Sequence, residues 1–119
     1  MPDKSETAAM FTDTAGTPLK MAEGKAKLSL VPLEAVEALA RVYEHGLVKY
    51  ERDSWRKFTP EQASACLPDA ALRHLLAYCS GEVLDPDSRL PHLAQVAWNC
   101  LTLHLITQQK EAGDGPNNV

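Results

Sequence analysis

The 119-residue sequence has no apolar run long enough to cross a membrane, and its N-terminus lacks the apolar segment of a secretory signal. Its 12 lysines and arginines are outnumbered by 16 acidic residues and form no basic tract. These absences predict a protein that neither enters a membrane nor binds nucleic acid directly. We therefore expect a cytoplasmic protein, and a chain of this length is typical of one small domain.

The sequence is also poor in cysteine, with only Cys66, Cys79 and Cys100. They are odd in number and lack CxxC spacing, and no obvious base lies beside them to make one a catalytic nucleophile. Because all three have apolar neighbours, we expect them to be buried thiols in a reducing compartment.

Helical periodicity recurs along the chain, whereas no stretch alternates apolar and polar residues as a strand would. The expected helices are 32–46 or 32–50, 60–67, 69–80 and 91–109, with a loop over 51–58. Pro68 separates the middle two because proline has no backbone N–H, and TPEQ at 59–62 is a capping-box pattern. The sequence predicts an all-α bundle of three to four helices, with 69–80 antiparallel to 91–109.

The folded domain is expected to span residues 24–109, because 1–23 and 110–119 are polar, aperiodic and typical of disorder. The residues of 69–80 expected to face inward are Leu72, Leu75, Leu76 and Cys79. The last helix is apolar almost all round, and so few helices cannot cover it completely. We therefore expect a homo-oligomer.

A polar stripe interrupts this apolar helix, with His92, Gln95, Asn99 and Thr102 at steps of three, four and three. This spacing places all four on one face, and a helix that is apolar all round is normally buried, so we expect this face to contact protein or an enclosed cleft. The stripe is then a hydrogen-bonded part of the core or one side of a ligand or metal site, and the alternative is that it is the one solvent-facing stripe of a packed helix.

The helical hairpin would bring further ligand-type residues to this stripe. His74 lies on the facing helix, and Glu82 and Asp85 lie in the turn before His92. Mixed nitrogen and oxygen ligands suit Mn²⁺, Fe²⁺, Ni²⁺ or Zn²⁺, whereas carboxylates alone suit Mg²⁺. We predict these four residues as ligands of a divalent cation, Mg²⁺ or Mn²⁺, with Glu82 and Asp85 also catalytic. Asp85 has an alternative role in complementing the dipole of the last helix.

Cationic and aromatic residues near this site suit contacts with phosphate and a base. The predicted substrate-binding residues are Lys49, Tyr50, Trp55, Arg56, Arg73 and Asn99. Glu34 and Glu37 form an ExxE pair on one helix face, where Glu37 is also placed to pair with Arg41. A solvated face is the default interpretation of this pair.

Several of these segments resemble a phage and prophage domain family described as the N-terminal domain of dATP/dGTP diphosphohydrolase. The resemblance covers about Gly24 to Leu103 and rests on Lys49-Tyr50, Trp55-Arg56-Lys57, Arg73-His74-Leu75, Gly81-Glu82, Asp85, Ser88, His92-Leu93-Ala94 and Asn99. Three positions differ from the family pattern: Ser54 replaces asparagine, Arg89 replaces glycine, and Gln95 replaces histidine.

The resemblance implies a metal-dependent dATP/dGTP diphosphohydrolase-like protein of the bacterial host cytoplasm, acting on a purine deoxynucleotide. One alternative is a non-catalytic module that sequesters a purine or signalling nucleotide, and another is a structural or interaction domain. The loss of a histidine at Gln95 favours binding over hydrolysis. The convergence of ligand-type residues at the hairpin favours either of these over a structural role.

Overall fold

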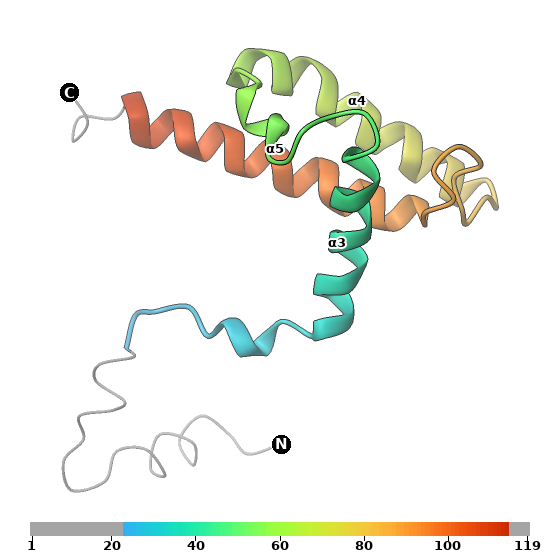
Figure 1. The fold of residues 1–119 in the computed structure, drawn as a ribbon, viewed down its shortest axis with the longest axis horizontal. Coiled ribbons are helices and arrows are strands. Elements are labelled where there is room, and N and C mark those ends of the chain that lie inside the picture. The colour runs from blue at the N-terminus through green and yellow to red at the C-terminus, as the bar shows by residue number, and fades with distance from the viewer. Residues whose placement is uncertain (1–22, 115–119) are drawn as a thin grey trace, which may run out of the picture. The chain divides into compact units, whose positions relative to one another are not determined.

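The computed structural model describes residues 23–114. Of the segments expected to be disordered, 1–22 and 115–119 lie outside the described residues, whereas 110–114 are helical. The described elements are η1 (Leu28–Leu30), α3 (Leu33–Gly46), η2 (Ser54–Lys57), α4 (Pro60–Cys79) and α5 (His92–Asp114) (Figure 1). No strand occurs in residues 23–114, which confirms the all-α class. Among the described residues, 23–31 belong to one unit and 32–114 to another, which contains α3, α4 and α5.

Helix α3 begins directly after Pro32, whose carbonyl accepts hydrogen bonds from Ala35 N (3.0 Å) and Val36 N (3.3 Å). The helix ends at Gly46 and does not reach Tyr50. Its apolar stripe is exposed near the start of the helix, at Leu33 and Val36. Toward the end of the helix, Leu39, Ala40 and Tyr43 are partly buried.

Helix α4 begins with the predicted capping box. Thr59 Oγ1 accepts from Gln62 N (3.1 Å), and Gln62 Oε1 accepts from Thr59 N (3.0 Å). The predicted break at Pro68 is wrong, because Pro68 lies inside α4, which is one continuous helix of 20 residues. Proline removes one intrahelical donor, a cost that the buried contacts of Leu67 and Ala71 on either side of Pro68 offset.

The inward face of α4 also differs from the prediction. Leu72 and Leu76 are 62% and 68% exposed, and Leu75 and Cys79 are exposed as well. The buried positions are instead Ala63, Leu67 and Ala71, at steps of four. Small alanines let α5 approach closely, whereas periodicity alone cannot choose between two apolar faces of one helix.

The prediction of buried thiols is wrong as well, since Cys66, Cys79 and Cys100 are all exposed. They lie on the outer faces of α4 and α5. These faces are apolar in sequence, but no other described element covers them.

The core lies where the segment before α4 packs against α4 and α5. Its buried members are Trp55, Ala63, Leu67 and Ile106, with Tyr43 and Trp98 among the partly buried residues around them. Trp55 belongs to η2, so the segment expected to be a plain loop supplies the largest core side chain.

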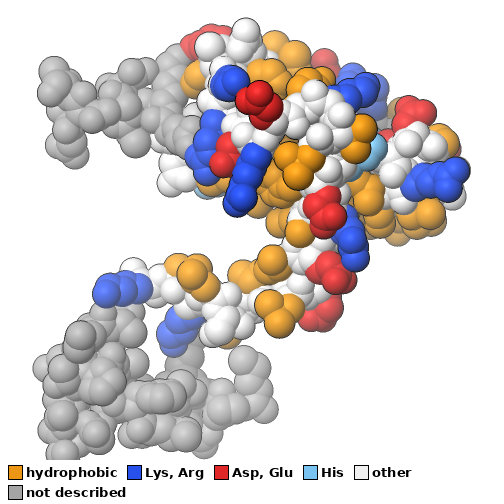
Figure 2. Space-filling view, viewed as in Figure 1, with side chains coloured by type: hydrophobic (Ala, Val, Ile, Leu, Met, Phe, Trp, Pro, Cys, Tyr) orange, Lys and Arg blue, Asp and Glu red, His pale blue; other side chains and the backbone are white. Residues whose placement is uncertain are grey.

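Helices α4 and α5 run side by side in opposite directions, which confirms the predicted antiparallel hairpin (Figure 1). The face of α5 that packs inward is the polar stripe, with His92 4%, Asn99 6% and Thr102 0% exposed. Leu93 and Leu101 are exposed, and Figure 2 shows further apolar side chains on the visible surface. No helix among the described residues is long and apolar enough to span a membrane.

Candidate functional site

The C-terminus of α4 fixes where the site begins. Glu82 N donates to Ala77 O and Gly81 N donates to Tyr78 O, both at 3.0 Å, which is a Schellman motif. Gly81 has φ of +103°, a left-handed conformation that glycine adopts without a steric penalty. The motif reverses the chain and places Glu82 directly beside the start of α5.

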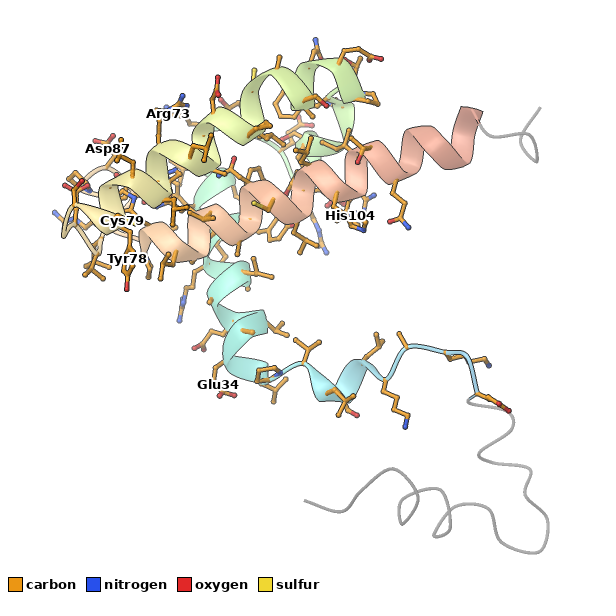
Figure 3. The ribbon with its side chains drawn as sticks, turned by 180° about the vertical axis from the view of Figure 1, so that it is seen from behind. Glu34, Arg73, Tyr78, Cys79, Asp87 and His104 are labelled. Atoms are coloured by element: carbon orange, nitrogen blue, oxygen red, sulfur yellow. The ribbon has the colours of Figure 1, made fainter. Side chains whose placement is uncertain are left out.

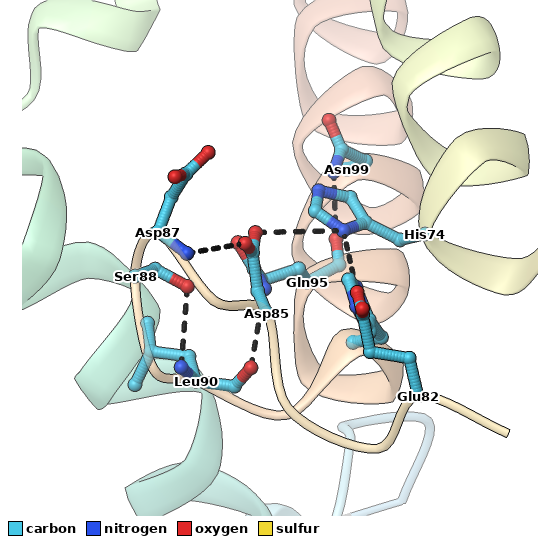
Figure 4. Close-up of polar contacts among 9 residues, drawn as sticks. His74, Glu82, Asp85, Asp87, Ser88, Leu90, Gln95 and Asn99 are labelled. Carbon is cyan, nitrogen blue, oxygen red and sulfur yellow. Dashed lines mark hydrogen bonds and ion pairs between the residues drawn. The ribbon is translucent and has the colours of Figure 1, made fainter. Parts of the chain in front are cut away.

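The connection between α4 and α5 is a short hairpin-like loop closed by backbone hydrogen bonds. His92 N donates to Val83 O and Asp85 N donates to Leu90 O, both at 2.9 Å. At its tip, Arg89 has φ of +64°, and Asp85 Oδ1 accepts from Asp87 N (2.9 Å). These bonds hold the Asp85 carboxylate in place against α4 and α5 (Figure 4).

Three predicted ligands meet at this loop. The Nδ1 atoms of His74 and His92 are 2.9 Å apart, and His74 Nδ1 lies 4.0 Å from Asp85 Oδ2. One ligand atom from each of these three residues lies within 4.8 Å of the others. The fourth predicted ligand, Glu82, contacts the opposite ring nitrogen of His92, with Oε1 2.7 Å from Nε2.

The spacing of these donor atoms suits a cation. Ligand atoms at about 2.1 Å from one metal ion lie about 3.0 Å apart at right angles and about 4.2 Å apart when opposite. The separations of 2.9 and 4.0 Å both fall close to this range. Two imidazoles and one carboxylate could therefore hold a divalent ion of the Mn²⁺ to Zn²⁺ group.

Burial and local hydrogen bonds set the charges of the cluster. Burial lowers the pKa of His74 below 6.5, an effect that nearby Asp85 opposes and nearby His92 and Arg73 reinforce. Burial by itself would raise the pKa of Asp85, but hydrogen bonds from Asp87 N and the Gln95 side chain, with the nearby histidines, lower it overall. A neutral imidazole beside an ionised carboxylate is the state that binds a metal ion.

A cleft of about 820 Å³ adjoins the cluster, a size typical of small-molecule sites. Its lining includes His74, Gln95 and Asn99 from the cluster and its surroundings. Its aromatic lining residues are Tyr43, Tyr50, Trp55, Phe58 and Trp98. Tyr43 lies edge-on to Trp98, with ring centroids 5.8 Å apart.

Two of these aromatic residues carry buried polar atoms without a partner. Trp55 Nε1 and Trp98 Nε1 have no hydrogen-bond partner among the described residues, and nor does Thr102 Oγ1 on the next turn of α5. Asn99 Nδ2, by contrast, donates to Gln95 O (2.7 Å). The polar stripe is thus only partly satisfied as a structural network.

The predicted substrate-binding residues divide into two groups. Tyr50, Trp55 and Asn99 line the cleft. Lys49, Arg56 and Arg73 do not: Lys49 is exposed, the Arg56 guanidinium lies 4.4 Å over the Trp55 ring, and Arg73 lies on the outer side of α4 (Figure 3).

Sequence reasoning missed several cleft residues. Tyr43 and Trp98 resembled ordinary core positions of apolar stripes. Arg52 lines the cleft, whereas the arginines predicted to contact substrate, Arg56 and Arg73, do not. Gln95 was noted in the stripe, but its hydrogen bond to Asp85 depends on the conformation of the loop.

The ExxE pair lies away from this site. Glu34 is at the start of α3 (Figure 3), and both Glu34 and Glu37 are exposed. Arg41 pairs with Glu44 at 3.9 Å, not with Glu37.

The sequence is similar to that of a known phage protein. The chain is 31% identical over 98 residues to a protein of Salmonella phage PMBT28 named dATP/dGTP diphosphohydrolase. The aligned region covers 82% of this chain and 32% of that protein, so the chain spans about a third of its relative's length. No solved structure matches the chain. Residues 15–115 match the family described as "dATP/dGTP diphosphohydrolase, N-terminal", and the chain therefore belongs to this family.

Proposed function

We propose that this domain binds a purine deoxynucleotide together with a divalent cation held by His74, Asp85 and His92. The observation that carries the proposal is the meeting of two imidazole nitrogens and a carboxylate beside an aromatic cleft. Flat aromatic walls suit stacking of a base, and Arg52 at the cleft suits contact with phosphate. When bound, the cation would neutralise phosphate charge and acidify water.

The donor set favours Mn²⁺ over Mg²⁺ as this cation. Mg²⁺ prefers oxygen ligands and retained waters, whereas imidazole suits Mn²⁺ and the later transition metals. Two of the three donors here are imidazoles.

Hydrolysis of the bound nucleotide requires a group that accepts a proton from water, for which Glu82 and Asp85 are the candidates. Glu82 Oε1 contacts His92 Nε2 at 2.7 Å, and Asp85 Oδ1 accepts from Asp87 N. Because each carboxylate already has a partner, binding without turnover is the second candidate function. Release of phosphate or pyrophosphate from dATP or dGTP with Mn²⁺ would establish the hydrolytic function, and tight binding without release the second.

The test of the binding proposal is His92→Ala with His104→Ala as its control, because His104 is an exposed histidine on the same helix (Figure 3). The parent should retain Mn²⁺ and bind dATP or dGTP in a calorimetric titration. His92→Ala should weaken both by about tenfold or more, with unchanged helix content, because one ligand is lost. His104→Ala should bind like the parent.

The opposite result has a distinct signature. If His92 only anchors a buried network, His92→Ala should cost about 1–3 kcal/mol of stability, because a partner is left unsatisfied. That result, with neither Mn²⁺ nor deoxynucleotide bound by the parent, would show that the polar stripe is only a structural part of the core. It would overturn the proposal.

A further inference from the structure

We propose that Glu82 is a positioning residue, which fixes the tautomer of His92 so that its Nδ1 lone pair faces the cation site. This inference rests on the cation site of the proposed function and assigns Glu82 a different role from that of ligand. It follows from which ring nitrogen each neighbour contacts.

The contact between Glu82 and His92 determines where the His92 hydrogen lies. The carboxylate oxygen Oε1 of Glu82 is 2.7 Å from His92 Nε2. A carboxylate only accepts hydrogen bonds, so Nε2 must carry the hydrogen. A neutral imidazole has only one such hydrogen, and His92 Nδ1 is therefore left with its lone pair. The His92 ring is 5% exposed, so little water competes for either nitrogen.

Glu82 is placed for this contact by the end of α4. The left-handed Gly81 and the hydrogen bond from Glu82 N to Ala77 O bring the side chain to the Nε2 edge of the ring. His74 lies at the Nδ1 edge, and the group of three ligand atoms from His74, Asp85 and His92 does not include Glu82. A carboxylate on the outer nitrogen of a metal-binding histidine orients the ring and increases its basicity.

The same reasoning assigns a different tautomer to His74. Its Nδ1 lies 2.9 Å from the His92 Nδ1 lone pair, so His74 Nδ1 must donate a hydrogen bond when no cation is present. A cation that takes both Nδ1 lone pairs displaces this hydrogen, and neutral His74 must then carry it on Nε2. Cation binding thus switches the tautomer of His74 and leaves that of His92 unchanged, with no net release of protons from the pair.

Nitrogen-15 NMR of the full chain at mildly alkaline pH tests both assignments, because the two ring nitrogens of a neutral histidine have distinct shifts. Without metal, His92 should be the Nε2–H form and His74 the Nδ1–H form. With Zn²⁺, which is diamagnetic, both should be Nε2–H. A His92 ring that is Nδ1–H without metal would overturn the proposal, and this measurement needs no variant.

The matched variants are Glu82→Ala, Glu82→Gln and Asp87→Asn, the last of which removes a charge from an exposed side chain of the same loop. Glu82→Ala should leave His92 in mixed tautomers and weaken Zn²⁺ binding by about 10- to 100-fold. Glu82→Gln keeps an acceptor oxygen and should recover part of the affinity, and Asp87→Asn should match the parent.

The outcomes separate this inference from the proposed function. Zn²⁺ affinity of Glu82→Ala within about twofold of the parent would overturn the positioning role while leaving the cation site intact. If the parent binds no cation, the proposed function fails, whereas the tautomer of His92 in the metal-free chain still decides what Glu82 does.

Discussion

The chemical state of the site depends on a few residues whose ionisation the fold controls. His74 is partly buried, and this burial is the main reason that its pKa lies below 6.5. Asp85 receives hydrogen bonds from Asp87 N and Gln95, and these outweigh the effect of burial, which by itself would raise its pKa. The result at neutral pH is a neutral imidazole beside an anionic carboxylate, which is the state that the proposed cation would require.

The lowered pKa of His74 predicts how stability depends on pH. Between its folded-state pKa and 6.5, the unfolded chain binds a proton that the folded chain does not. The free energy of unfolding should therefore be unaffected by His74 above pH 6.5 and should decrease as the pH falls from 6.5 toward the folded-state pKa. Cation affinity should fall over the same range, because protons compete for the imidazole.

Urea unfolding at several pH values above and below 6.5 measures this effect, with His74→Gln as the comparison. The free energy of unfolding of the variant should no longer decrease just below pH 6.5. It should still decrease below pH 3.8, where Asp85 is protonated in the unfolded chain. Equal pH dependence in parent and variant near pH 6 would contradict the prediction.

Among the structural elements, the loop between α4 and α5 has the greatest influence on the site. It carries Glu82 and Asp85, and its backbone bonds tie Val83 to His92. Arg89 adopts φ of +64°, a left-handed conformation. This conformation is strained for a residue with a side chain, whereas glycine adopts it without a steric penalty.

Arg89→Gly should therefore stabilise the protein. The left-handed conformation costs a non-glycine residue about 1–2 kcal/mol, and part of this gain is offset by the greater freedom of glycine in the unfolded chain. We expect a net increase of about 0.5–1 kcal/mol in the free energy of unfolding, measured by urea denaturation. Arg41→Gly, within right-handed α3, should instead destabilise by about 1 kcal/mol. A loss of stability in Arg89→Gly would show that the Arg89 side chain itself stabilises the loop.

The whole molecule has more apolar surface than its described helices cover. The exposed face of α4 carries Leu72 and Leu76, and that of α5 carries Leu93 and Leu101. A groove of about 340 Å³ between these helices is lined mainly by apolar residues, including Leu67 and Leu103. Apolar surface of this kind, on helices that bury a polar stripe, favours association with a second copy of the chain.

We expect the protein to be an oligomer in solution, as light scattering at micromolar concentration would measure. Leu72→Lys should shift it toward the monomer, because a charge on a buried contact face is costly. Ser64→Lys adds the same charge at an exposed polar position of α4 and should have a weaker effect. A monomeric parent would contradict the prediction.

Much of the fold and of the site followed from local signals. The capping box at Thr59, the stop at Gly81 and the helical periodicity depend on residues close in sequence, so they could be predicted without tertiary information. That His74, Asp85 and His92 lie close together could also be predicted, because an antiparallel hairpin places its facing residues by simple counting along each helix.

What only the tertiary structure decided was which face each element buries. Helix α4 has two apolar faces, and the one with Ala63 and Ala71 is buried because small side chains allow close approach of α5. Helix α4 also continues through Pro68, because packing on either side offsets one missing hydrogen bond. The placing of Glu82 on the outer nitrogen of His92, and of Trp55 in the core, depends on loop conformations set by contacts distant in sequence. Such contacts leave no periodic signal, since each forms only when the helices have packed.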